Sequence, residues 1–235
     1  MKRDTWVAML PYYLLAVILM IGVARFGSDA VTVIGQGGGL KRSHIFIIDA
    51  GHGYPDGGAT SCTGVLESEI NLQIAVRLND LLHFLGYETL MTRTNSDSIY
   101  TEGESIAAKK VSDLKERVRI VNTTENAILI SIHQNTYPDS RYGGPQVLYA
   151  TKTDSKDLAS SLQFALKNVL DPSSRRAAKK GSGVYLMEQI NKAGVLVECG
   201  FISNPEEEAK LRKDTYQKTL CAVIATAVAG YLQSG

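Results

Sequence analysis

Four residues able to support hydrolytic chemistry lie at the ends of apolar runs or just before a helical pattern. His52 and His133 each follow a short run of β-branched and other apolar residues, and Glu198 ends a third such run. Glu67 directly precedes a long helical pattern. In open α/β sheets, ligands bind at the edge where the carboxyl ends of the strands meet. We therefore expect the side chains at the three strand ends to converge on one pocket.

Two imidazoles and one carboxylate form a common catalytic zinc set, in which water completes the coordination. The candidates here are His52, Glu67 and His133, separated by 15 and 66 residues. These spacings match no compact zinc motif. On spacing alone, the histidines can equally be hydrogen-bonded loop residues, and Glu67 can simply stabilise the positive end of the following helix.

The segments that must position these residues alternate between strand and helix patterns from residue 44 onward. Short runs rich in β-branched residues predict strands at 44–49, 87–92, 127–132, 147–149, 184–187 and 195–197. Apolar periodicity predicts helices at 68–85, 113–122, 156–170, from 205 onward and at 215–232. The polar insertion at 95–110 is expected to be a surface loop or a short helical excursion. This alternation predicts an α/β fold with a twisted, mostly parallel sheet covered by helices on both faces.

The first 24 residues have the pattern of an export signal. Lys2 and Arg3 precede residues 6–24, which contain no charged side chain. Such a run is typical of a cleaved signal peptide or an N-terminal membrane anchor, and a buried core helix is the third option. Residues 25–43 are glycine-rich and indicate a linker, which leaves 44–235 as one catalytic domain. Either of the first two options places this domain outside the cytoplasmic membrane, secreted or anchored.

The composition excludes some classes of protein. The chain of 235 residues has 25 basic and 24 acidic side chains, a formal net charge of +1, which argues against a nucleic-acid binder. Its three cysteines, Cys62, Cys199 and Cys221, are odd in number and show no C-x-x-C spacing, so we expect free buried thiols. Cys199 follows Glu198 in a predicted strand. Alternation turns its thiol away from the face of Glu198, which argues against a thiol nucleophile.

Four separated segments together resemble a known family. They lie, in order, at 48–53, 64–72, 131–135 and 195–204. They are similar to the signature blocks of the zinc-dependent N-acetylmuramoyl-L-alanine amidases called amidase type 3. The resemblance implies that His52, Glu67 and His133 bind one zinc ion and that Glu198 is the catalytic glutamate. It also implies cleavage of the amide bond between N-acetylmuramic acid and L-alanine in peptidoglycan.

A closer resemblance is to the sporulation and germination branch of this family. It is carried by the segments 105–117 and 175–180, and by a catalytic domain without wall-binding repeats. Those enzymes strip peptides from the spore cortex so that muramic-δ-lactam can form. The resemblance therefore implies that this chain acts in the space around the forespore cortex. Asn135 lies two residues after His133 and is a candidate substrate-binding residue. The expected partners are peptidoglycan and an accessory or regulatory protein. Membrane contact is expected only through the N-terminal segment.

Two other functions are weighed. A zinc peptidase acting on the peptide stem would need a cation to hold a terminal carboxylate, and Arg93 and Arg117 are the residues considered, although both are expected to be structural. A catalytically silent regulator would bind wall fragments or a partner. The intact set of His52, Glu67, His133 and Glu198 argues against the regulator.

Overall fold

The structure is a computed structural model that describes residues 44–234. The predicted signal or anchor at 1–24 and the predicted linker at 25–43 lie outside the described residues. Within the described residues, no helix is both long enough and apolar enough to cross a membrane.

A six-stranded sheet forms the centre of the fold, in the order β2-β1-β3-β6-β4-β5. The strands are β1 Ile45–Ala50, β2 Glu88–Met91, β3 Ala127–Asn135, β4 Gln146–Tyr149, β5 Lys179–Lys180 and β6 Ala193–Phe201. The pairs β2–β1, β1–β3, β3–β6 and β4–β5 are parallel, and only β4–β6 is antiparallel. The prediction of a mostly parallel sheet is confirmed. Because β1, β3 and β6 are parallel neighbours, their carboxyl ends lie side by side.

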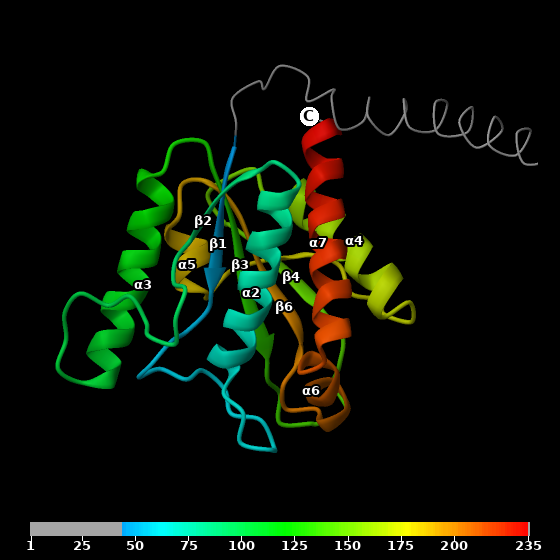
Figure 1. The fold of residues 1–235 in the computed structure, drawn as a ribbon, viewed down its shortest axis with the longest axis horizontal. Helices are drawn as coiled ribbons and strands as arrows, with labels where there is room; N and C mark the ends of the chain where they lie inside the picture. Colours follow the sequence, from blue (N-terminus) through cyan, green and yellow to red (C-terminus); the bar gives the residue numbers. More distant parts are fainter. Residues whose placement is uncertain (1–43, 235) are drawn as a thin grey trace, which may run out of the picture. The chain divides into compact units, whose positions relative to one another are not determined.

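Helices cover both faces of the sheet, as predicted (Figure 1). They are α2 Glu67–Phe84, α3 Ile106–Thr123, α4 Lys156–Leu170, α5 Tyr185–Gln189, α6 Pro205–Leu211 and α7 Asp214–Ser234. In Figure 1, α2, α4 and α7 lie on one side of the sheet and α3 and α5 on the other, while α6 lies near the carboxyl end of β6.

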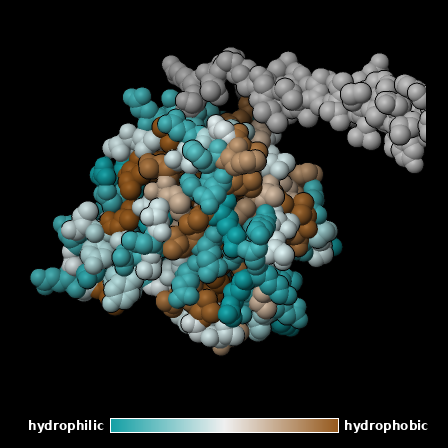
Figure 2. Space-filling view, viewed as in Figure 1, coloured by the Kyte–Doolittle hydropathy of each residue, from teal (hydrophilic) through white to brown (hydrophobic). Residues whose placement is uncertain are grey.

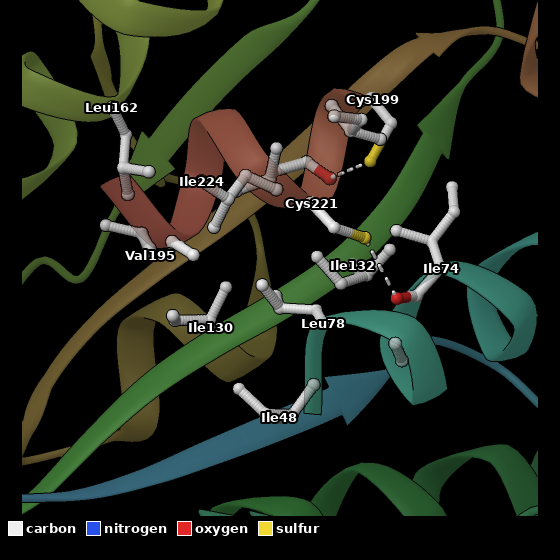
Figure 3. Close-up of a cluster of buried hydrophobic side chains, with 14 of the residues drawn as sticks. Ile48, Ile74, Leu78, Ile130, Ile132, Leu162, Val195, Cys199, Cys221 and Ile224 are labelled. Atoms are coloured by element: carbon white, nitrogen blue, oxygen red, sulfur yellow. Dashed lines mark hydrogen bonds between the residues drawn. The ribbon is translucent and has the colours of Figure 1, made fainter. Parts of the chain in front are cut away.

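The side chains of β1, β3, β4 and β6 alternate between two hydrophobic clusters. Ile48 and Ile130 pack into the larger cluster, beneath α2, α4 and α7, whereas Ile47 and Leu129 pack into the smaller one, beneath α3 and α5. Figure 3 shows strand residues of the larger cluster meeting Leu78 of α2 and other helical side chains. This period of two is what a sheet buried on both faces requires. The surface on the side of α2 and α7 interleaves hydrophilic and hydrophobic residues (Figure 2).

Two predicted elements are corrected by the structure. Residues 184–187, predicted as a strand, are the N-cap and the first three residues of helix α5. The Glu188 side chain accepts a hydrogen bond from the Gly183 amide at 2.7 Å and so ties the helix to the chain that precedes it. Helix α3 begins at Ile106, seven residues before the predicted 113. Its first turns expose Ile106 and Val111 at 59% and 52%, so they carry no buried stripe that periodicity can detect. The short strand β5 was not predicted.

The cysteine prediction is correct for two of the three residues. All three thiols are free, and Cys199 and Cys221 are buried, but Cys62 is exposed. Cys199 belongs to the cluster beneath α7 (Figure 3). It therefore faces away from Glu198, as strand alternation predicted. Burial raises the pKa of the Cys199 thiol, which keeps it protonated and unsuited to act as a nucleophile.

Helix α4 offers a matched test of the core. Leu162 is fully buried in the larger cluster, whereas Phe164 on the same helix is 66% exposed. We expect Leu162→Ala to lower the free energy of unfolding by about 2–5 kcal/mol because it leaves a cavity. Phe164→Ala should change it by less than about 0.5 kcal/mol. Urea unfolding of the full-length chain, followed by circular dichroism, measures both, and equal losses would contradict this packing.

Candidate functional site

Glu67 is the centre of the site because its carboxylate reaches both candidate histidines. It is the first residue of α2 and lies almost fully buried at the positive end of the helix. Oε2 lies 3.3 Å from His52 Nε2, and Oε1 lies 3.0 Å from His133 Nδ1. The backbone amides of Ala59 and Gln134 donate to the same carboxylate at 2.9 and 3.1 Å. These contacts fix Glu67 in one orientation.

His52 lies in the loop that follows β1, with its ring held at both nitrogens. Nε2 faces Glu67, and Nδ1 is 2.9 Å from Asp56 Oδ2, which also pairs with Lys110 at 3.0 Å. The backbone of His52 has φ 59°, a left-handed conformation that is uncommon outside glycine. Arg117 stabilises it by donating from Nη2 to the His52 carbonyl at 2.7 Å.

His133 lies in β3, and its ring packs edge-on against that of His52, with centroids 4.9 Å apart. A Cβ at Gly51 would lie 2.2 Å from His133 Nε2. Only glycine therefore allows the chain after β1 to pass so close to this ring. Gly51 therefore leaves room for the His133 ring and also allows the loop to turn before His52.

Glu198 is placed beside this group by the register of the sheet. It is the direct partner of His133 across the parallel β3–β6 pair, so both side chains leave the same face. Its Oε2 atom is buried and has no hydrogen-bond partner among residues 44–234. Burial raises the pKa of Glu198 to about 7, with Glu67 adding to the effect and the nearby histidines opposing it. A carboxyl group near neutrality can both take and return a proton.

The charges of Asp56 and Glu67 polarise His52. Burial disfavours the protonated imidazole, but the hydrogen bonds and charges of these two carboxylates outweigh it and raise the pKa of His52 to about 9. Burial likewise favours the protonated form of Glu67, yet His133 and His52 together hold its pKa well below the usual range. Glu67 therefore stays ionised.

The three residues predicted to bind metal come together, and their chemistry fits zinc. One ligand atom from each of His52, Glu67 and His133 lies within 4.8 Å of the others. Two imidazoles and one carboxylate are a known zinc donor set. Asp56 on the far nitrogen of His52 supplies the outer hydrogen bond that zinc-binding histidines commonly have. Asp56 was not predicted, although a carboxylate four residues after a candidate ligand was a usable signal.

Other predicted residues lie outside this group. Asn135 ends β3, accepts a hydrogen bond from the Thr136 amide at 2.8 Å, and is not among the clustered ligand atoms. Arg93 and Arg117 are both buried, at 4% and 2% exposure. Arg93 donates to the backbone carbonyls of Ala50 and Gly51. The interpretation of both arginines as structural agrees with these contacts.

Comparison with known proteins assigns the family. The family model for N-acetylmuramoyl-L-alanine amidases matches residues 46–230. The chain belongs to this amidase family. The germination-specific N-acetylmuramoyl-L-alanine amidase of Bacillus subtilis is 35% identical over 189 residues, which cover 80% of this chain and 79% of that protein. The resemblance drawn from the four sequence segments is confirmed.

Solved structures of related amidases share the fold. The CwlD amidase from Clostridioides difficile, solved in complex with the GerS lipoprotein, superposes with a TM-score of 0.78 at 34% identity, covering 82% of this chain and all of that one (100%). An N-acetylmuramoyl-L-alanine amidase from Clostridium difficile 630 gives a TM-score of 0.72 at 28% identity, covering 82% and 98% of the two chains.

The raised pKa of His52 predicts that protons compete with zinc for this imidazole. Zinc binds the neutral imidazole, so a proton must leave His52 when the ion enters. We expect the apparent zinc affinity to rise about tenfold per pH unit from this proton as pH approaches 9, and to level off above it. Competition with a chromophoric chelator between pH 6 and 10 measures this, and an affinity that is flat from pH 7 to 9 would contradict it.

Asp56 is expected to support His52 as a ligand. In Asp56→Asn, the plateau of zinc affinity at high pH should fall by about 10–100-fold, because the outer carboxylate that orients the imidazole is lost. The plateau should also begin at lower pH, since Asp56 raises the pKa of His52. Asp97→Asn is the control, because Asp97 is an exposed acid on the neighbouring loop and contacts neither histidine. Equal zinc affinity in both variants would refute this role of Asp56.

Proposed function

We propose that this chain is a zinc-dependent hydrolase of the amide bond between N-acetylmuramic acid and L-alanine in peptidoglycan. His52, Glu67 and His133 hold one zinc ion, and Glu198 is the catalytic residue. The observation that carries the proposal is the position of Glu198. Its Oε2 atom is buried, has no hydrogen-bond partner among residues 44–234, and lies next to a cluster of three ligand atoms. An unpartnered buried carboxyl oxygen is costly, and a water or substrate proton would satisfy it.

The reaction needs a stronger nucleophile and a better electrophile than water and an amide provide at neutral pH. When bound, zinc polarises the carbonyl and lowers the pKa of water. Glu198 takes the proton of the attacking water and delivers it to the nitrogen of the departing alanine. A pKa of about 7 suits both transfers, because such a group both accepts and releases a proton readily near neutral pH. Glu67 stays ionised and does not compete for this proton.

The biological substrate that we propose is spore cortex peptidoglycan. The 35% identical relative from Bacillus subtilis is named a germination-specific amidase. Removal of the stem peptide frees the lactyl carboxyl group of muramic acid, which is the group that closes muramic-δ-lactam. Residues 1–24 would direct export, as a signal peptide or an anchor, to the space around the forespore.

An accessory protein is proposed as a partner. The related CwlD amidase was solved with the GerS lipoprotein. A protein of similar kind would bind the catalytic domain of this chain outside the cytoplasmic membrane.

Replacing Glu198 by Gln tests the catalytic assignment. We expect Glu198→Gln to reduce the release of stem peptides at least about 100-fold because the proton acceptor is lost, while zinc stays bound. Mass spectrometry of muropeptides shows new free N-terminal alanine, and elemental analysis gives the zinc content.

The matched control is Cys199→Ala, which alters the next residue of β6 but faces α7. It should keep its activity within about threefold, as expected of a change outside the reacting groups. Full activity of Glu198→Gln, or inactivity of Cys199→Ala with zinc still bound, would sink the assignment. Release of C-terminal amino acids would instead support the peptidase alternative, and an absence of products the regulator.

A further inference from the structure

A cationic and aromatic cluster follows Glu198 along the same strand. Phe201 ends β6 and is buried, and its ring centroid lies 6.4 Å from that of Tyr142. The rings of Tyr142 and Tyr137 are 4.4 Å apart. The guanidinium of Arg176 lies 5.2 Å from the centre of the Phe201 ring. We call Tyr137, Tyr142, Arg176 and Phe201 the Arg176 patch.

Arg176 has unused capacity to bind an anion. Its guanidinium carries five N–H donors, but within the described part of the chain it donates only from Nη2 to the Gly143 carbonyl, at 3.1 Å. No carboxylate within residues 44–234 pairs with it. Glu207, which lies beside Gly143, accepts instead from the amides of Gly144 and Phe201. An arginine that stacks on a ring and lacks an acidic partner is suited to bidentate binding of a carboxylate.

An irregularity in β6 relates the patch to the reacting group. His133 pairs with Glu198, but Asn135 pairs with Phe201, so two steps along β3 match three along β6. Strand β6 therefore contains one extra residue at this point, which is a β-bulge. A bulge changes which side chains share a face, so Phe201 can lie on the side of Glu198 although the two are three residues apart.

The residues around Phe201 confirm which face it occupies. Cys199 and Ile202 belong to the larger cluster, beneath the helices. A Cβ at Gly200 would lie 3.3 Å from Leu211 of α6, so this position also faces the helices. Phe201 is buried but belongs to neither hydrophobic cluster. Its ring and Arg176 therefore lie on the opposite side of the strand, which is the side of Glu198.

The spacing fits a charged group near the start of a peptide. Phe201 lies opposite Asn135, two residues beyond the His133–Glu198 pair, so it is roughly 7 Å from Glu198 along the sheet. A group on the second residue of a peptide stem lies about two residues from the cleaved bond, roughly 7 Å away. The two distances therefore match.

Several basic residues flank Arg176 in the sequence, and the tyrosine rings of the patch are accessible. Arg175, Lys179 and Lys180 lie within a few residues of it, and strand β5 holds both lysines exposed at the edge of the sheet. Tyr137 and Tyr142 are 48% and 46% exposed. Positive potential attracts an acidic ligand, and tyrosine rings offer packing surface with a polar tip.

We propose that the Arg176 patch is a substrate subsite that binds the free α-carboxylate of the second stem residue. Arg176 pairs with this carboxylate, and the tyrosine rings pack against the rest of the stem. The inference rests on the proposed amidase function, because it places the peptide outward from the cleaved bond along β6. It predicts preference for a stem with D-glutamate at this position over one with D-isoglutamine, in which a carboxamide replaces the carboxylate.

The test uses the zinc-loaded full-length chain with N-acetylmuramoyl-L-alanyl-D-glutamate and N-acetylmuramoyl-L-alanyl-D-isoglutamine. These substrates differ only in the group that Arg176 would bind. We expect wild type to prefer the carboxylate by about 10–100-fold in kcat/KM, as for a hydrogen-bonded ion pair. Arg176→Gln should remove this preference by lowering kcat/KM for the carboxylate substrate alone, mainly through a higher KM. Arg176→Lys should keep part of it, and Arg175→Gln, which changes the neighbouring exposed arginine, should keep all of it.

The products separate failure of this inference from failure of the proposed function. Release of L-alanyl-D-glutamate with equal kcat/KM for both substrates in wild type would overturn the subsite and leave the amidase intact. Equal losses on both substrates in Arg176→Gln would assign Arg176 a structural role and also overturn it. Release of free D-glutamate would overturn the proposed function itself. Isothermal titration of the two dipeptide products gives a second readout, in which only Arg176→Gln should lose the tighter binding of L-alanyl-D-glutamate.

Discussion

A buried guanidinium fixes the chain at the point where β1 leaves the sheet and enters the site. Arg117 contacts the carboxylates of Asp49 and Asp113 and donates to the carbonyls of Ala50 and His52 at 2.8 and 2.7 Å. Burial disfavours its charge, but the two carboxylates outweigh this and raise the pKa of Arg117. Removing one side of such a network costs about 3–5 kcal/mol, since it leaves a buried charge uncompensated. The left-handed backbone of His52 depends on this anchor.

Glu67 joins the remaining parts of the site around that fixed loop. Its carboxylate links His52 from the first loop with His133 from β3, and the parallel register adds Glu198 from β6. The site then contains two carboxylates with opposite tendencies. Hydrogen bonds from the histidines keep Glu67 ionised, whereas burial raises the pKa of Glu198 to about 7. Such a separation of acidities fits the proposed roles, metal binding for Glu67 and proton transfer for Glu198.

The sequence predicted the parts of this arrangement that depend on local pattern. Alternating strands and helices gave the parallel sheet, and the strand ends located His52, His133 and Glu198. The pattern of the sequence could not predict contacts between segments that are far apart in the chain. By contrast, the hydrogen bond between Asp56 and His52 spans only four residues, and that spacing was a usable signal that was not used. The bulge that turns Phe201 toward the site leaves no mark on periodicity, because it depends on pairing with β3.

The proposed chemistry depends most on a metal held by two imidazoles and one carboxylate. X-ray absorption at the zinc edge of the loaded full-length chain tests this directly. The structure predicts nitrogen and oxygen neighbours at about 2.0–2.1 Å, with imidazole scattering that decreases in His133→Ala. A sulfur neighbour at about 2.3 Å, or a spectrum unchanged by His133→Ala, would contradict it.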